Sequence, residues 1–179
     1  GWLVAASLMV LAGGAFWWWW AAAGGDAEAE EPELVRLTPN DERSYIDPAI
    51  SADGKFVAYR LAAGEESQIW IQAVGSDTPV QLSSLSGFRD TPRFAPDGAS
   101  VFFVHQSKSP LRSTIDRVSI LGGAPRVVVA MNAVIQVVAV LASEPQLCFR
   151  SHAAGDAGVR RLFCHNLSSG ETREIEAYR

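Results

Sequence analysis

The sequence contains few of the residues from which catalytic and metal sites are usually built. Its 179 residues include three histidines, His105, His152 and His165, and two cysteines. No histidine lies at metal-ligand spacing from another histidine or from a cysteine pair; Cys164 adjoins His165, but neighbours in a strand point to opposite faces. A Gly-x-Ser-x-Gly nucleophile motif is also absent. We therefore expect no catalytic residue, no metal and no cofactor in this chain.

Positive charge is missing from the first 35 residues, and charge of either sign is missing from the first 25. Acidic residues then gather between Asp26 and Glu33, ahead of the first basic residue, Arg36. This segment accounts for the formal net charge of −5, and the rest of the chain is close to neutral. Because no basic face is available for phosphate contacts, nucleic acid is not an expected partner.

Within this uncharged stretch lies the apolar run Trp2–Ala23, which is 22 residues long. As a helix it would span about 33 Å at about 1.5 Å per residue, enough to cross a hydrocarbon core of about 30 Å. Four consecutive tryptophans at 17–20 lie near its end, where indole rings favour the headgroup layer. We expect residues 1–23 to form a transmembrane helix, with 2–23 in contact with the lipid bilayer. Residues 24–34 are expected to form an acidic, solvated linker.

A cleaved signal peptide is the main alternative, because small residues at 21–23 follow the apolar run. The apolar core of a signal peptide is shorter, about 7–15 residues. A buried soluble helix is a third possibility. No Lys or Arg follows the run within the acidic linker, which favours export of the residues beyond it. We therefore expect a single-pass protein of the inner (cytoplasmic) membrane, with the later residues on the periplasmic, extracytoplasmic side.

Two stretches of the remaining sequence repeat one pattern. PAISADGKFVAY covers Pro48–Tyr59 and PRFAPDGASVFF covers Pro92–Phe103, which places their Asp-Gly pairs 44 residues apart. Asp-Gly between β-rich runs is a strong hairpin signal, because glycine adopts positive φ freely and aspartate tolerates it. A period of this length is typical of one four-stranded β-propeller blade. The predicted structural turn residues are Asp53, Gly54, Asp97 and Gly98.

The fold is therefore expected to be mainly β, a partial β-propeller of about three four-stranded antiparallel blades. The predicted propeller segment is 35–179, with blades at about 35–83, 84–129 and 130–179. A longer polar loop is expected at 106–113 in the second blade. The third blade is degraded, because Ser143-Glu144 stands where the Asp-Gly pair is expected. Since propellers close with 4–8 blades and the chain begins with Gly rather than Met, we expect the propeller to be incomplete.

The residues SADGKFVAY at 51–59, with IW at 69–70, resemble the TolB-like propeller family, whose repeats are described as WD-repeat-like. The resemblance covers 37–129 most clearly, and it implies that Asp53 and Asp97 set blade turns and need not touch a ligand. A single membrane helix followed by such repeats is similar to large bacterial receptors. In those receptors a cytoplasmic Ser/Thr kinase domain or a winged-helix DNA-binding domain precedes the helix. Neither domain occurs in these 179 residues.

Other polar residues have both structural and functional interpretations. Cys148 and Cys164 are expected on neighbouring strands, so they either form a disulfide outside the cytoplasm or remain buried thiols. Asp47 and Asp90 lie just before the prolines of the first two units, and their recurrence favours turn capping over paired catalytic carboxylates. Trp70 is expected in the core or between blades, rather than stacked on a ligand.

These observations favour a non-enzymatic function: a membrane-anchored propeller segment that binds an unidentified protein or peptide outside the membrane, as part of a larger sensing protein. The alternative is enzymatic, since membrane-anchored peptidases resembling prolyl oligopeptidase carry a comparable propeller before an α/β-hydrolase domain. Even then this chain would hold no catalytic residue. A soluble TolB-like accessory protein is a third possibility, and it requires removal of the first 23 residues.

Overall fold

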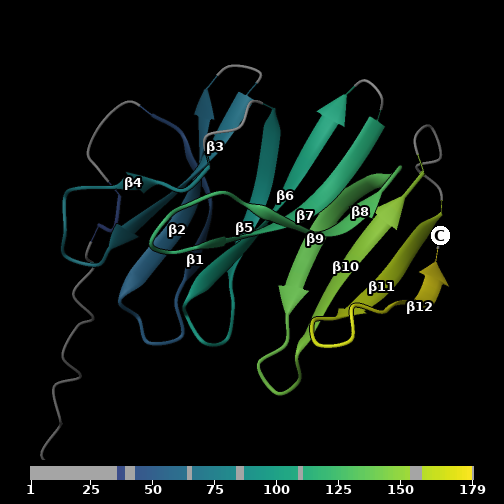
Figure 1. The fold of residues 1–179 in the computed structure, drawn as a ribbon. Coiled ribbons are helices and arrows are strands. Elements are labelled where there is room, and N and C mark those ends of the chain that lie inside the picture. The colour runs from purple at the N-terminus through teal and green to yellow at the C-terminus, as the bar shows by residue number, and fades with distance from the viewer. Residues whose placement is uncertain are drawn as a thin grey trace, which may run out of the picture. The chain divides into compact units, whose positions relative to one another are not determined.

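The computed structural model describes residues 36–38, 43–63, 66–83, 87–108, 111–153 and 159–178. Within these ranges the chain forms strands and turns, and no helix (Figure 1). No helix of the described part is therefore long and apolar enough to cross a bilayer. The expected transmembrane helix at 1–23 and the linker at 24–34 lie outside the described residues.

The strands form three antiparallel sheets of four, and each sheet uses its strands in chain order. The first contains β1 (Tyr45–Ile50), β2 (Phe56–Ala63), β3 (Glu66–Ala73) and β4 (Val80–Gln81). The second contains β5 (Phe88–Phe94), β6 (Ser100–Lys108), β7 (Leu111–Ser119) and β8 (Arg126–Met131). The third contains β9 (Val134–Val140), β10 (Gln146–His152), β11 (Arg160–Asn166) and β12 (Thr172–Tyr178). The prediction of a mainly β fold with four-stranded antiparallel blades is confirmed.

The second sheet is covered on both faces, which explains the apolar run at 101–104. Val101 and Phe103 pack with Ile69 and other residues of the first sheet. Phe102 and Val104 point the other way and pack with residues of the third sheet. All four side chains are buried. Alternation along one strand thus fills two separate hydrophobic cores, one on each side of the middle sheet.

The first strands of the three sheets are neighbours, since β1 contacts β5 and β5 contacts β9 (Figure 1). Turns within each sheet consequently gather at two ends. One end holds the β1–β2, β5–β6 and β9–β10 turns, and the opposite end holds the β8–β9 connection, the end of β10 and the start of β11. Residues that approach one another at either end can therefore come from different sheets.

The polar loop expected at 106–113 is wrong. Strand β6 continues to Lys108 and β7 begins at Leu111, and their residues stay paired along the whole length. The prediction failed because it treated polar residues as a loop signal. Backbone pairing continues past the apolar core, and exposed polar side chains are compatible with the end of a two-stranded ribbon.

Candidate functional site

Both Asp-Gly pairs occupy the turns between the first two strands of their sheets. Gly54 and Gly98 have φ of +70° and +67°, where a β-carbon is strained. The Asp53 carboxylate accepts hydrogen bonds from the Ser51 hydroxyl at 2.6 Å and the Lys55 N–H at 3.1 Å. These bonds, the one from Ser51 foremost, lower the pKa of Asp53. Asp97 similarly accepts the N–H of Ala99 at 2.9 Å.

Cys148 and Cys164 face each other across β10 and β11 and are joined by a disulfide. Their Cα atoms are 4.1 Å apart. Leu147 and Phe149, the neighbours of Cys148 in the strand, point into the core shared with the second sheet. By alternation the disulfide lies on the opposite face of the third sheet.

The recurring feature before each proline is a backbone conformation rather than a carboxylate. Asp47 and Thr91, which directly precede Pro48 and Pro92, have φ of 52° and 53°. Asp90 is therefore not the counterpart of Asp47, and the interpretation of the two as a recurring pair is wrong. The Asp47 carboxylate instead accepts a hydrogen bond from Nε of Arg60 at 3.3 Å.

The three histidines lie in different surroundings. Nδ1 of His105 is 3.8 Å from a carboxylate oxygen of buried Asp116. His165 is buried beside the Thr172 hydroxyl, with Nδ1 and Oγ1 2.8 Å apart, and its burial lowers its pKa. His152 lies at the end of β10. In the part of the chain that the structure describes, no three His, Cys, Asp or Glu side chains are grouped so that they could hold a metal ion.

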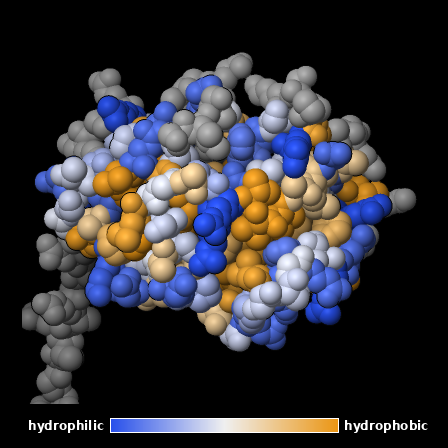
Figure 2. Space-filling view, viewed as in Figure 1, coloured by the Kyte–Doolittle hydropathy of each residue, from blue (hydrophilic) through white to orange (hydrophobic). Residues whose placement is uncertain are grey.

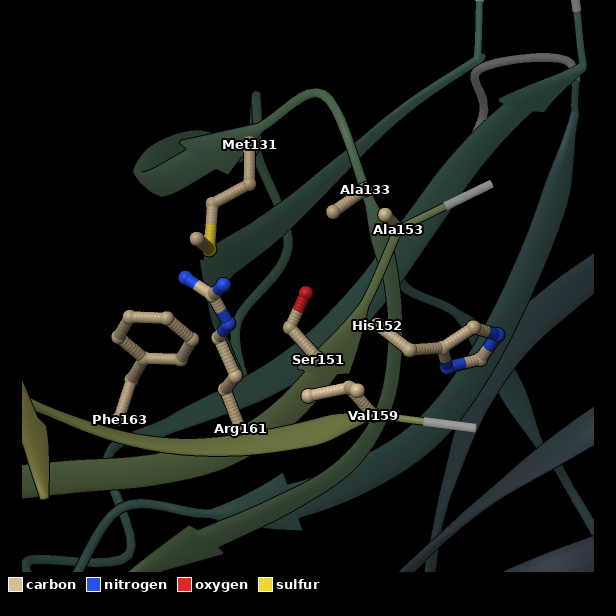
Figure 3. A pocket seen from close by; sticks show the side chains of 8 residues that line it. All are labelled: Met131, Ala133, Ser151, His152, Ala153, Val159, Arg161 and Phe163. Carbon is tan, nitrogen blue, oxygen red and sulfur yellow. The ribbon is translucent and has the colours of Figure 1, made fainter. Parts of the chain in front are cut away.

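Figure 2 shows several apolar patches divided by polar residues on the face it presents, so hydropathy alone singles out no binding region there. Concave sites are more informative. A cavity of about 280 Å³ lies between the second and third sheets, where β10 ends and β11 begins. We refer to it as the Arg161 cavity (Figure 3). Its lining residues are Met131, Ala133, Ser151, His152, Ala153, Val159, Arg161 and Phe163.

The guanidinium of Arg161 is the charged group of this cavity. Arg161 and Phe163 project from the same face of β11, because they are two residues apart in the strand. Figure 3 shows the Arg161 guanidinium beside Met131 and the Ser151 hydroxyl directed into the same space. Nη1 of Arg161 is 3.6 Å from the Glu174 carboxylate, and both side chains are about half exposed. An ion pair this exposed contributes little to stability, on the order of 0–1 kcal/mol.

The other wall of the Arg161 cavity is apolar and fixed by packing. The Phe163 ring stacks on Phe149, with centroids 5.6 Å apart and planes inclined by 18°. Met131 packs against the core between the second and third sheets. A cation, a buried hydroxyl and an aromatic ring thus converge on one space, which suits a ligand with an anionic group and an apolar part.

Ser151 and His152 do not form a nucleophile and base. They are adjacent in β10, so their side chains point to opposite faces. Figure 3 shows the His152 imidazole directed away from the Ser151 hydroxyl. The arrangement is therefore suited to binding rather than to acyl transfer.

A second cavity, of about 450 Å³, lies between the same two sheets at the end that holds the Asp-Gly turns. It includes Asp97, Glu144 and Arg117. Arg117 already has three partners there: its Nε donates to Ser100 at 2.7 Å, its Nη2 is 3.8 Å from Asp97, and its guanidinium lies 5.5 Å from the Phe102 centroid. The charges of this cavity support the turn, so the Arg161 cavity is the better candidate for ligand binding.

Little in the sequence alone indicates the Arg161 cavity. Its residues come from β8, the β8–β9 connection, β10 and β11, and their proximity depends on the packing of two sheets. Every second residue of β11 lies on the same face of the strand, which the sequence indicates for Arg161, Phe163 and His165. That pattern does not show which residues of the neighbouring sheet they meet.

Comparison with known proteins shows the fold. No family model matches the chain, and no curated protein sequence matches it. Among solved structures, an Agrobacterium tumefaciens protein provisionally assigned as TolB has a TM-score of 0.67 at 18% identity, with 79% of this chain and 51% of that chain covered. TolB from Acinetobacter baumannii has a TM-score of 0.60 at 15% identity, with 72% and 31% covered.

The β-propeller domain of the Trilobed protease from Pyrococcus furiosus has a TM-score of 0.58 at 18% identity, with 76% of this chain and 42% of that chain covered. The chain thus spans about half or less of the length of these propeller proteins. At these identities the likeness shows the fold alone: the three sheets are consecutive blades of a TolB-like β-propeller.

Proposed function

We propose that this chain is a membrane-anchored, extracytoplasmic propeller segment that binds a protein or peptide, within a larger bacterial receptor with a kinase or winged-helix domain. The observation that carries the binding function is the Arg161 cavity, which opens between two rigid blades and combines a cation with an apolar wall. Rigid blades that hold loops and cavities in fixed positions are well suited to recognition. The uncharged run 2–23 and the acidic segment after it support the anchor and its orientation.

Protease protection on inner-membrane vesicles tests the location. Right-side-out spheroplasts and inverted vesicles that contain the full chain are treated with protease, and the fragments are probed with an antibody against 160–179. The propeller is expected to be digested in spheroplasts and protected in inverted vesicles. Protection in spheroplasts and digestion in inverted vesicles would contradict the proposed orientation. Recovery of the chain in the soluble fraction after carbonate extraction would contradict the anchor.

A second candidate is the N-terminal propeller of a membrane-anchored serine peptidase resembling prolyl oligopeptidase. The likeness to the propeller domain of the Trilobed protease favours it. The flanking genomic sequence separates the two proposals. A kinase or winged-helix domain upstream of the apolar run supports the receptor, whereas Gly-x-Ser-x-Gly downstream of residue 179 supports the peptidase.

A further inference from the structure

We propose that the Arg161 cavity binds a carboxylate attached to an apolar group, such as the C-terminal residue of a peptide. This inference rests on the proposed ligand-binding function and adds the chemistry of the ligand. It is carried by four residues from the second and third sheets: Met131, Ser151, Arg161 and Phe163.

The Arg161 guanidinium has donors to spare. Arginine presents five N–H groups in a planar fork that matches a carboxylate. Among the described residues its recorded interaction is the single contact of Nη1 with Glu174 at 3.6 Å, which is too long for a hydrogen bond. A carboxylate that enters the cavity can therefore take two parallel N–H bonds, and displaces at most a weak surface ion pair.

Ser151 supplies a second donor at the base of the cavity. The residue is only 4% exposed, yet its hydroxyl is directed into the space beside Arg161 (Figure 3). Because Ser151 lines the cavity, its hydroxyl can donate a hydrogen bond to a carboxylate oxygen that enters the same space. The hydroxyl and the guanidinium together define where the two carboxylate oxygens bind.

The apolar wall selects what the carboxylate is attached to. Phe163 is held in place by its stacking on Phe149, so its ring offers a fixed surface. With Met131 it lines a cavity of about 280 Å³, below the usual 300–1,000 Å³ of pockets for larger ligands. This volume suits one apolar residue rather than a large ligand. One guanidinium also matches a monoanion better than a phosphate dianion, which usually meets several donors or cations.

The test uses the full chain in detergent micelles and two matched probes, N-acetyl-phenylalanine and its uncharged amide, in saturation-transfer NMR titrations. The acid is expected to bind at least about tenfold more tightly than the amide, because hydrogen bonds to a charged group are worth about one decade or more in affinity. A third probe, N-acetyl-aspartate amide, distinguishes an acidic side chain from a C-terminus. If it binds as tightly as N-acetyl-phenylalanine, the carboxylate specificity stands and the preference for an apolar residue is refuted.

Variants identify the site. Arg161→Gln is expected to weaken binding of the acid by about tenfold and to leave the amide unchanged. Arg160→Gln is the matched control, since Arg160 is the exposed neighbour whose side chain points to the other face of β11. Glu174→Gln is expected to tighten binding, because it removes the competing carboxylate. Thermal melts of each variant establish that it is folded.

The inference is overturned if acid and amide bind equally, if Arg160→Gln weakens binding as much as Arg161→Gln, or if neither probe binds at millimolar concentration. Each of these results leaves the proposed membrane location untouched, because protease protection measures that separately. Conversely, a reversed orientation in vesicles would refute the location and leave the chemistry of the cavity in place.

Discussion

Phe103→Ala is expected to destabilise the chain strongly and to act through the contact between the first and second sheets. The Phe103 side chain is fully buried and packs with Ala58, Ile69 and Ile71 of the first sheet. Burial of a phenylalanine removes roughly 150–250 Å² from water, and its replacement by alanine also leaves a cavity. The expected loss is about 3–5 kcal/mol, a large part of the roughly 5–15 kcal/mol typical of a domain.

Urea unfolding of the full chain in micelles, followed by far-UV circular dichroism, measures this loss. Leu121→Ala is the matched control, because Leu121 is an equally apolar residue of the second sheet's last turn with 93% of its surface exposed. Its replacement is expected to change the free energy of unfolding by less than about 0.5 kcal/mol. If Phe103→Ala costs less than about 1 kcal/mol, or no more than Leu121→Ala, the two sheets are not packed through this residue and the reasoning is refuted.

Three further predictions follow from single contacts. The Cys148–Cys164 bridge closes a loop with a sequence separation of 16, so its reduction is expected to lower the free energy of unfolding, measured in thermal melts, by about 3 kcal/mol. Two free thiols in non-reducing peptide mapping of oxidised protein would disprove the bridge. Burial lowers the pKa of His165, so the unfolded chain takes up the proton first and stability is lost as the pH falls below about 6.5. The melting temperature should fall between pH 7.5 and 5.5, and it should fall less in His165→Gln. An equal fall in the melting temperature of both proteins would contradict this. Gly98→Ala should lower the free energy of urea unfolding by about 1–2 kcal/mol, because the residue has φ of +67°, which an alanine adopts only with strain. No atom lies within 4 Å of the added carbon, so steric contact adds nothing to this cost. An unchanged free energy of unfolding would show that the turn tolerates a side chain.

The parts of the fold that follow a local rule were predictable from the sequence. Two turns are marked by Asp53-Gly54 and Asp97-Gly98, because each turn needs a residue with positive φ and the glycine of the pair supplies it. The uninterrupted apolar run at 101–104 indicates a strand with two buried faces, although the sequence does not say which sheets cover them.

Other features depend on contacts that a linear pattern does not contain. The end of β6 at Lys108 is set by backbone pairing with β7, so the polarity of its side chains was misleading. The positive φ of Thr91 was missed because threonine rarely adopts it and Asp90 offered a more familiar turn residue. The Arg161 cavity joins residues from two sheets, and its existence follows from their packing alone.

The burial of β6 on both sides has a mechanical consequence. Its Phe102 and Val104 support the same sheet pair that encloses the Arg161 cavity, while Val101 and Phe103 hold the first sheet. Close-packed protein interiors have low compressibility, so they transmit a displacement to the elements packed against them. A ligand that pushes the second and third sheets apart would therefore also displace the first sheet, because only the one layer of strand β6 separates the two cores.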